Sequence, residues 1–106
     1  MRVSTHVLDA GTGTPARGVP VRLETGDGAV ITSAITDDDG RASVLSTDLQ
    51  AGIFRLTFDT GAYFHATAQV GFYPEVIIAF VVTDPNRHLH LPVLLSPFAY
   101  STYRGS

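Results

Sequence analysis

Short runs in which apolar and polar positions alternate recur along the chain, and clusters of Gly, Asp and Pro separate them. Alternation places apolar side chains on one face of a strand, and its repetition at short intervals is typical of an all-β sandwich. The pattern predicts strands over 2–8, 19–26, 29–36, 41–45, 53–60, 75–83, 88–95 and 98–105. The stretch 61–71 breaks the alternation and is expected to form one short helix. We therefore expect a single domain, residues 1–106, with seven or eight strands.

Two of these runs differ in how strictly apolar and polar residues alternate. Residues 53–58 alternate cleanly, with Phe54, Leu56 and Phe58 on one face. Residues 75–83, EVIIAFVVT, are almost continuously apolar. A run of this kind is typical of a strand that is buried on both faces, so we expect 75–83 to be a central strand.

Composition narrows the classes of function. The chain has no Cys, which excludes disulfides and thiol catalysis, and its net charge is −3 with 7 basic residues, all of them Arg. A nucleic-acid surface needs a clustered basic face, and none is indicated. The opening MRVSTHVLDAGTG has no apolar run of the length of a signal peptide, and no stretch reaches the roughly 18 apolar residues of a membrane span. We expect a cytoplasmic protein without membrane or nucleic-acid partners.

Three histidines are candidates for chemistry. His88 and His90 are two positions apart, so on a strand they share a face. His6 lies on another strand, on the same face as Ser4 and Leu8. Three imidazoles can bind Zn²⁺ and leave a position open for water, but an HxH pair is a weak signal and each histidine alone is equally explained by a structural role. Arg41 follows an Asp-Gly turn, where a solvated Arg would also be unremarkable.

The end of the chain, FAYSTYRGS, is unusually rich in hydroxyl groups. As a strand, it would place Ala99, Ser101 and Tyr103 on one face and Phe98, Tyr100, Thr102 and Arg104 on the other. The polar groups are therefore not confined to one side. Hydroxyl groups beside imidazoles suit a small polar pocket.

Five blocks together resemble the 5-hydroxyisourate hydrolases of the transthyretin-like family. They are STHVLDAGTGTPARGVPVRL, TDDDGR, FDTGAYF, FYPEVIIAFVV and HLHLPVLLSPFAYSTYRGS. The blocks span nearly the whole chain. The middle blocks alone are weak, because many β-sandwich modules contain similar turns, whereas the closing Tyr-Arg-Gly-Ser combined with THVLD and HxHxP is specific.

The resemblance implies the roles of individual residues. The catalytic residues that it implies are His6, Arg41, His90 and Tyr103, and the substrate-binding residues are Arg41, Tyr103, Arg104, Gly105 and Ser106. No metal and no cofactor are implied. The chain departs from the family pattern at Leu89, where an aromatic is usual, and at Val93, where Leu is more typical; both are expected to point away from the catalytic face.

The resemblance also implies an architecture and an activity. The fold is a transthyretin-like sandwich of two four-stranded antiparallel sheets, with dimers joined edge to edge and two dimers packed face to face into a homotetramer. The active sites lie in the channel between dimers. The reaction is hydrolysis of 5-hydroxyisourate to 2-oxo-4-hydroxy-4-carboxy-5-ureidoimidazoline, a step of urate degradation.

Direct attack by water on a ring amide fits the residues present, because the chain lacks Cys and has no GxSxG nucleophile elbow. His6 or His90 would serve as general base and Arg41 would stabilise negative charge. Three alternatives remain open at this stage: a transthyretin-like carrier of a small aromatic ligand, a structural β-sandwich module, and a hydrolase that binds metal through His6, His88 and His90.

Overall fold

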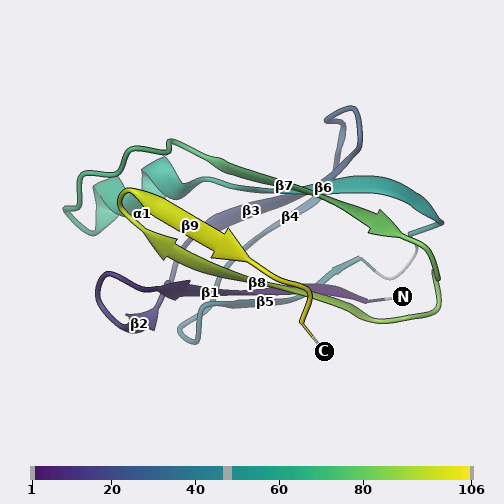
Figure 1. Ribbon diagram of the computed structural model, residues 1–106, viewed down its shortest axis with the longest axis horizontal. Helices are drawn as coiled ribbons and strands as arrows, with labels where there is room; N and C mark the ends of the chain where they lie inside the picture. The colour runs from purple at the N-terminus through teal and green to yellow at the C-terminus, as the bar shows by residue number, and fades with distance from the viewer. Residues whose placement is uncertain (1, 47–48, 106) are drawn as a thin grey trace.

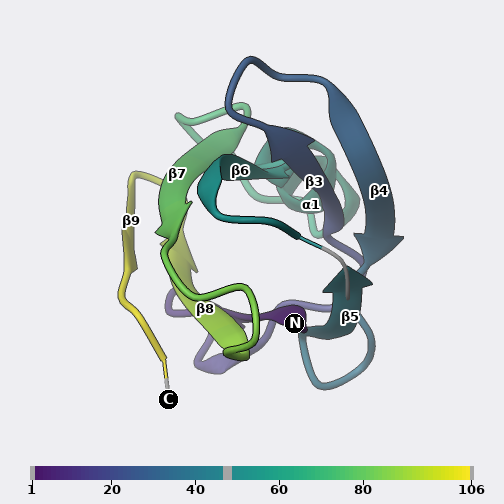
Figure 2. The same cartoon turned by 90° about the vertical axis from the view of Figure 1, so that its right-hand side faces the viewer.

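The structure, a computed structural model, describes residues 2–46 and 49–105. Two β-sheets lie face to face, with one short helix at one end (Figure 1 and Figure 2). The elements in chain order are β1 Val3–Asp9, β2 Thr14–Pro15, β3 Pro20–Thr25, β4 Val30–Ile35, β5 Arg41–Ser46, β6 Gly52–Phe58, α1 Thr60–Ala66, β7 Val76–Val82, β8 Leu89–Ser96 and β9 Ala99–Thr102. The predicted all-β sandwich with one short helix is confirmed.

The first sheet has the strand order β2-β1-β8-β9, with β5 also paired to β1, and the second has the order β4-β3-β6-β7. The expected antiparallel pairing holds except between β1 and β8, which run parallel. The short β2 was not predicted, and it makes the first sheet five-stranded. Alternation of side chains indicates a strand but carries no information on its direction. Since β1 and β8 are far apart in the chain, the long connection between them permits a parallel pair.

The position of β7 corrects one expectation. This strand lies at the edge of the second sheet, not at its centre. Its ends Val76 and Val82 are buried, but Ile77 is 45% exposed and Val81 is 60% exposed. The apolar run identified the strand correctly, whereas its place in the sheet depends on pairing with β6, which the run does not encode. The edge strand therefore presents apolar side chains to the outside.

The core lies between the inner faces of the two sheets. Its fully buried side chains include Val3 and Val7 of β1, Val21 and Leu23 of β3, Leu56 and Phe58 of β6, and Val93 and Leu95 of β8. Full burial of one such side chain stabilises the fold by about 1.5–3 kcal/mol. Because these residues of each strand lie two or four positions apart, they share one face, and the residues at odd offsets from them face outward. The core thus fixes which side chains of β1 and β8 reach the outer surface.

Helix α1 is tied to β1 by a buried polar contact. The helix begins after Asp59, whose side chain accepts a hydrogen bond from the backbone N–H of Ala62 at 3.0 Å. The hydroxyl of Tyr63 donates to Oδ2 of Asp9 at 2.7 Å. Burial raises the pKa of Asp9, but its hydrogen bonds, led by those from Tyr63 and Gln69, outweigh burial and hold the pKa below its ordinary value.

Within residues 2–46 and 49–105, no helix has the length and apolar character needed to cross a membrane.

The chain after β9 folds back onto β8. Strand β9 ends at Thr102, earlier than the predicted 98–105. The backbone N–H of Gly105 donates to the carbonyl oxygen of His90 at 2.9 Å, in an isolated antiparallel bridge. A Cβ at position 105 would lie 2.6 Å from Cδ2 of His90. Only glycine therefore lets the tail approach His90 this closely.

Candidate active site

The outer face of the first sheet carries the polar residues that the core excludes. On β1, Val3, Thr5 and Val7 are buried in the core, so Ser4 and His6 project from the opposite face. The neighbouring strand β5 pairs with β1 so that Arg41 lies directly opposite His6. Opposed residues of paired strands have side chains on the same face, so Arg41 and His6 are neighbours there.

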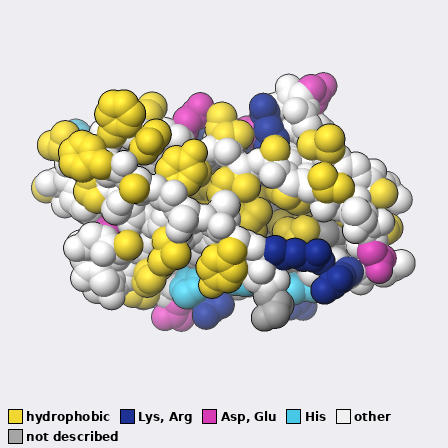
Figure 3. Space-filling model, viewed as in Figure 1, with side chains coloured by type: hydrophobic (Ala, Val, Ile, Leu, Met, Phe, Trp, Pro, Cys, Tyr) yellow, Lys and Arg dark blue, Asp and Glu magenta, His cyan; other side chains and the backbone are white. Residues whose placement is uncertain are grey.

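Strand β8 and the residue just before it add the other two imidazoles to this face. The parallel register places Ser4 opposite His90, and the inward residues of β8 are Leu91, Val93 and Leu95. The outward residues are therefore His88 and His90, as their spacing predicts. In Figure 3, His and Arg side chains gather along the lower edge of the molecule, where β1, β5 and β8 lie in Figure 1. Strands β1, β5 and β8, with the residue just before β8, thus bring five polar side chains to one face: Ser4, His6, Arg41, His88 and His90.

Ser4 links His90 of β8 with His88, which lies just before that strand. Its Oγ is 2.8 Å from Nδ1 of His90 and 3.3 Å from Nε2 of His88. The two imidazoles are nearly parallel, with ring centroids 6.4 Å apart and an interplanar angle of 15°. The orientation of the His90 ring is therefore set by a side chain from a different strand.

The surroundings of His90 favour its neutral form. Burial lowers the pKa of His90, and the positive charge of Arg41 and then the imidazoles of His6 and His88 lower it further. Burial and positive neighbours act in the same direction because both disfavour a cationic ring. A neutral imidazole with a lowered pKa can accept a proton near neutral pH, which is the property required of a general base.

A polar cavity of about 310 Å³ opens over this face. Its lining includes Arg2, Ser4, Arg41, His88 and His90. His6 is half-buried beside Arg41, but it is not part of the described lining of this cavity. The cavity is of a size that a small planar molecule could occupy, and Arg41 and His90 both face it.

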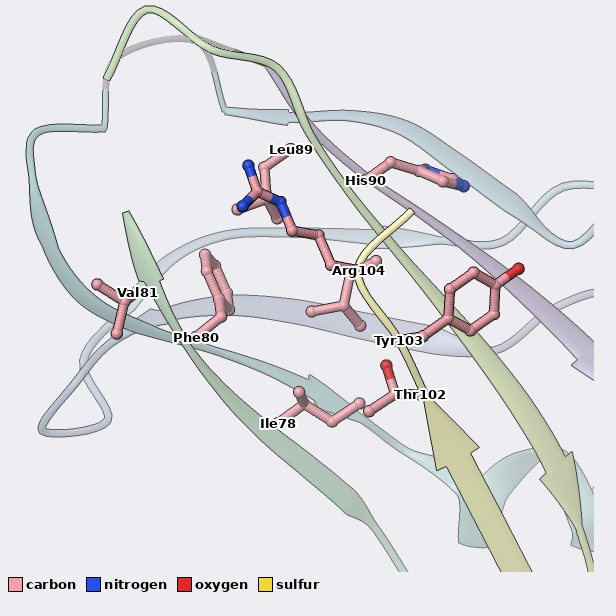
Figure 4. A pocket seen from close by; sticks show the side chains of 9 residues that line it. Ile78, Phe80, Val81, Leu89, His90, Thr102, Tyr103 and Arg104 are labelled. Carbon is pink, nitrogen blue, oxygen red and sulfur yellow. The ribbon is translucent and has the colours of Figure 1, made fainter. Parts of the chain in front are cut away.

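A second, more apolar cavity of about 270 Å³ lies between β7 and the chain that follows β9. His90 lines both cavities. Figure 4 shows the rings of Tyr103 and His90 extending to the same side, whereas the guanidinium of Arg104 extends to the other side, next to Leu89. The two polar side chains of the tail therefore point to different sides. Tyr103 points toward the face that carries His90, and Arg104 points toward the cavity between β7 and the tail.

The predicted site residues are thus only partly assembled in one chain. His6, Arg41 and His90 share one face of the first sheet, Tyr103 extends to the side of His90, and the Gly105 backbone is bonded to His90. Arg104 points away from this group. Ser106 lies outside the described residues. The remaining histidine, His65, is exposed on α1, as expected for a surface residue.

The described residues do not bring the histidines together into a metal site. Among the described residues, no three His, Asp or Glu side chains are grouped closely enough to hold a metal ion. The alternative of a zinc ion bound by His6, His88 and His90 therefore has no support in the geometry. Metal independence itself stays a prediction.

Ser4 is the residue that sequence reasoning missed. The alternation of β1 already placed it on the face of His6, but nothing in the sequence paired it with His90, 86 positions further along the chain. That contact depends on the parallel pairing of β1 and β8, whereas antiparallel sheets were expected. The sequence therefore indicated that Ser4 shares a face with His6, but it did not indicate that β1 and β8 run parallel.

Comparison with known proteins agrees with this architecture. The HIUase/Transthyretin family matches residues 3–105. The 5-hydroxyisourate hydrolase of Salmonella dublin is 41% identical over 109 residues, which cover 98% of this chain and 80% of that protein. The structure of Klebsiella pneumoniae 5-hydroxyisourate hydrolase superposes with a TM-score of 0.90 at 41% identity and full coverage of both chains. Sea bream transthyretin in complex with thyroxine gives a TM-score of 0.88 at 31% identity, covering 99% of this chain and 95% of that one. The chain belongs to the HIUase/Transthyretin family.

Proposed function

We propose that this protein hydrolyses 5-hydroxyisourate to 2-oxo-4-hydroxy-4-carboxy-5-ureidoimidazoline in urate degradation. The observation that carries the proposal is the placement of His6, Arg41 and His90 on one outer sheet face, with a polar cavity above Arg41 and His90. Relatives 41% identical over nearly the whole chain bear the name 5-hydroxyisourate hydrolase. An imidazole with a lowered pKa beside a guanidinium supplies the groups that hydrolysis needs.

The reaction proceeds by direct attack of water on an amide carbon of the six-membered ring. One of the imidazoles, His6 or His90, takes a proton from the water, the C–N bond breaks, and the ring nitrogen receives a proton as it leaves. A positioned acid or base of this kind contributes about 10² to 10⁴-fold to the rate. Since the chain has no Cys, a thioester intermediate has no nucleophile.

Arg41 stabilises the negative charge that develops on the carbonyl oxygen during attack. A guanidinium donates hydrogen bonds in a fixed planar geometry and remains charged at all relevant pH values. Tyr103, whose ring extends to the side of His90, would support the base and contact the substrate. Substrate binding would also involve Arg104, Gly105 and Ser106, and these three roles rest on the resemblance of the closing tetrapeptide.

A carrier function is the second candidate. It is supported by the likeness to a transthyretin that was solved with thyroxine. A site for a hydrophobic aromatic ligand would favour apolar side chains where this chain has His6, Arg41 and His90. The polar face therefore favours the enzyme.

We further propose a homotetramer whose copies complete the site. The edge strands β7 and β9 lie on the same side of the sandwich (Figure 2), and both carry exposed apolar side chains, among them Val81 and Tyr100. Joining these edges between two copies would cover apolar surface. Packing the first sheets of two copies face to face would enclose the cavity above Arg41.

We also propose a cytoplasmic location, which cell fractionation would test.

The test is a decay assay. Urate oxidase generates 5-hydroxyisourate in a cuvette, and its disappearance is followed with and without the protein. We expect a rate well above the spontaneous one, which survives exhaustive chelation of metals. Decay at the spontaneous rate, together with saturable binding of thyroxine, would favour the carrier instead.

A further inference from the structure

The hydroxyl of Ser4 lies between the imidazoles of His88 and His90. Its Oγ is 2.8 Å from Nδ1 of His90 and 3.3 Å from Nε2 of His88. A hydroxyl has one hydrogen to donate and two lone pairs that accept. Ser4 can therefore donate to only one of the two rings, so at least one of the two ring nitrogens must carry a hydrogen that it donates to Oγ.

We propose that Ser4 is a positioning residue that holds His90 in its Nδ1–H tautomer and so leaves the Nε2 lone pair free to take a proton from water. In this arrangement Nδ1–H of His90 donates to Oγ of Ser4, and the Ser4 hydroxyl donates to Nε2 of His88. The inference rests on the proposed function and deepens it, because it assigns the general base to His90.

Proton uptake decides the direction of these hydrogen bonds. Once Nε2 of His90 has gained a proton from water, both ring nitrogens carry hydrogen and Nδ1 can only donate. If Ser4 already accepts from Nδ1, the hydrogen bond is kept through the step and no group has to rotate. If Ser4 instead donated to Nδ1, Nε2 of the neutral ring would already carry a hydrogen and could not take one from water.

The backbone makes this contact a fixed feature of the sheet. Ser4 and His90 are directly opposed in the parallel ladder of β1 and β8, and Ser4 is only 7% exposed. Water therefore has little access to compete for Oγ. The carbonyl oxygen of His90 also accepts from Gly105, so the residue is held on both its backbone and its ring.

Several charged or titratable groups surround His90 in addition to Ser4. They are His6 of β1, Arg2 before β1, Arg41 of β5, His88 just before β8, and Tyr103 and Arg104 after β9. Among the described residues, Ser4 is the hydrogen-bond partner of the His90 ring. Burial of the ring and then the positive charge of Arg41 lower the pKa of His90 and so favour the neutral ring, which is the form that has a tautomer to select.

The tautomer can be measured without substrate. Long-range ¹H–¹⁵N NMR of the intact protein distinguishes a protonated ring nitrogen from a bare one, and it should show Nδ1–H for His90. Ser4→Ala should shift His90 toward Nε2–H, and Ser4→Thr, which keeps a hydroxyl, should restore Nδ1–H. Ser33→Ala, which removes an exposed hydroxyl from β4 in the other sheet, is the matched control and should leave the signal unchanged.

Kinetics provide the second readout. Ser4→Ala should lower kcat roughly 10 to 100-fold with little change in KM, because a base held slightly out of place loses rate and not binding. Ser4→Thr should recover most of kcat. His88→Ala should keep the Nδ1–H signal of His90, since Ser4 still accepts from it.

The outcomes separate this inference from the proposed function. An Nε2–H tautomer of His90 in the unmodified protein, or a tautomer that Ser4→Ala leaves unchanged, refutes the inference even when the protein hydrolyses 5-hydroxyisourate. A protein that does not accelerate the decay refutes the proposed function, and with it the role of His90 as base, whatever the tautomer.

Discussion

His90 is the residue at which most of the interactions of the site meet. It contacts Ser4 through its ring and Gly105 through its carbonyl oxygen, and it lines both cavities. Its pKa is lowered by burial and then by Arg41, His6 and His88. The chemistry of this residue is therefore set by side chains of β1 and β5, by His88 just before β8, and by the backbone of the tail.

The lowered pKa of His90 gives a prediction at this scale. NMR titration should place it below the ordinary imidazole value of about 6.5. Arg41→Gln removes a positive charge that disfavours the protonated ring, so the pKa of His90 should rise and the neutral form should be lost at a higher pH. A fall or no change in the pKa of His90 would show that Arg41 does not act on it.

At the scale of elements, the tail after β9 is held by one backbone hydrogen bond next to the site. We expect Gly105→Ala to lower activity, because the added Cβ would lie 2.6 Å from Cδ2 of His90 and must displace either the ring or the tail. A displacement of about 1 Å can cost about 10²-fold in rate. The fold should be intact by circular dichroism, since Gly105 follows the last strand. Unchanged kcat in a folded variant would mean that the approach of the tail to His90 has no part in catalysis.

Helix α1 gives a separate prediction about stability. Tyr63→Phe removes the donor to Asp9, and urea unfolding should show a loss of about 1–3 kcal/mol. The hydrogen bonds of Asp9 lower its folded-state pKa below 3.8, so their contribution is fully present above that pH and is lost as the pH falls through the lower folded value. The difference between variant and parent should therefore shrink in acid.

Tyr73→Phe is the matched control for this stability measurement, because it removes a hydroxyl from the segment between α1 and β7. It should change stability little. Equal losses for the two variants would contradict a special role for the contact between Tyr63 and Asp9.

The elements also show what the sequence could and could not predict. Alternation and the apolar run 75–83 identified the strands other than β2, and the break in alternation identified the helix. Alternation also placed Ser4 with His6, and His88 with His90, on shared faces. It could not predict the parallel pairing of β1 with β8 or the edge position of β7. The alternation of side chains along a strand is the same whichever strand it pairs with and in whichever direction that strand runs. The roles of His6, Arg41 and His90 came from a resemblance, since the periodicity of each strand alone is equally consistent with surface polar residues.

At the scale of the whole molecule, one chain leaves its site open. The cavity above Arg41 and His90 lies on an outer sheet face, and the edges β7 and β9 expose apolar side chains. We expect a homotetramer, so light scattering should give a mass about four times the 11.3 kDa of the chain. A stable monomer with full activity would contradict a site shared between copies.

The central claim is that the imidazoles on the outer face of the first sheet carry out hydrolysis, and the decay of 5-hydroxyisourate tests it most directly. The rate would be compared for the unmodified protein and for His6→Ala, His90→Ala and His88→Ala, each confirmed to be folded. We expect His6→Ala and His90→Ala to lower turnover by about 10² to 10⁴-fold and His88→Ala to have a much smaller effect. Turnover that persists in His6→Ala and His90→Ala would contradict the account, because the reaction would then take place elsewhere on the protein.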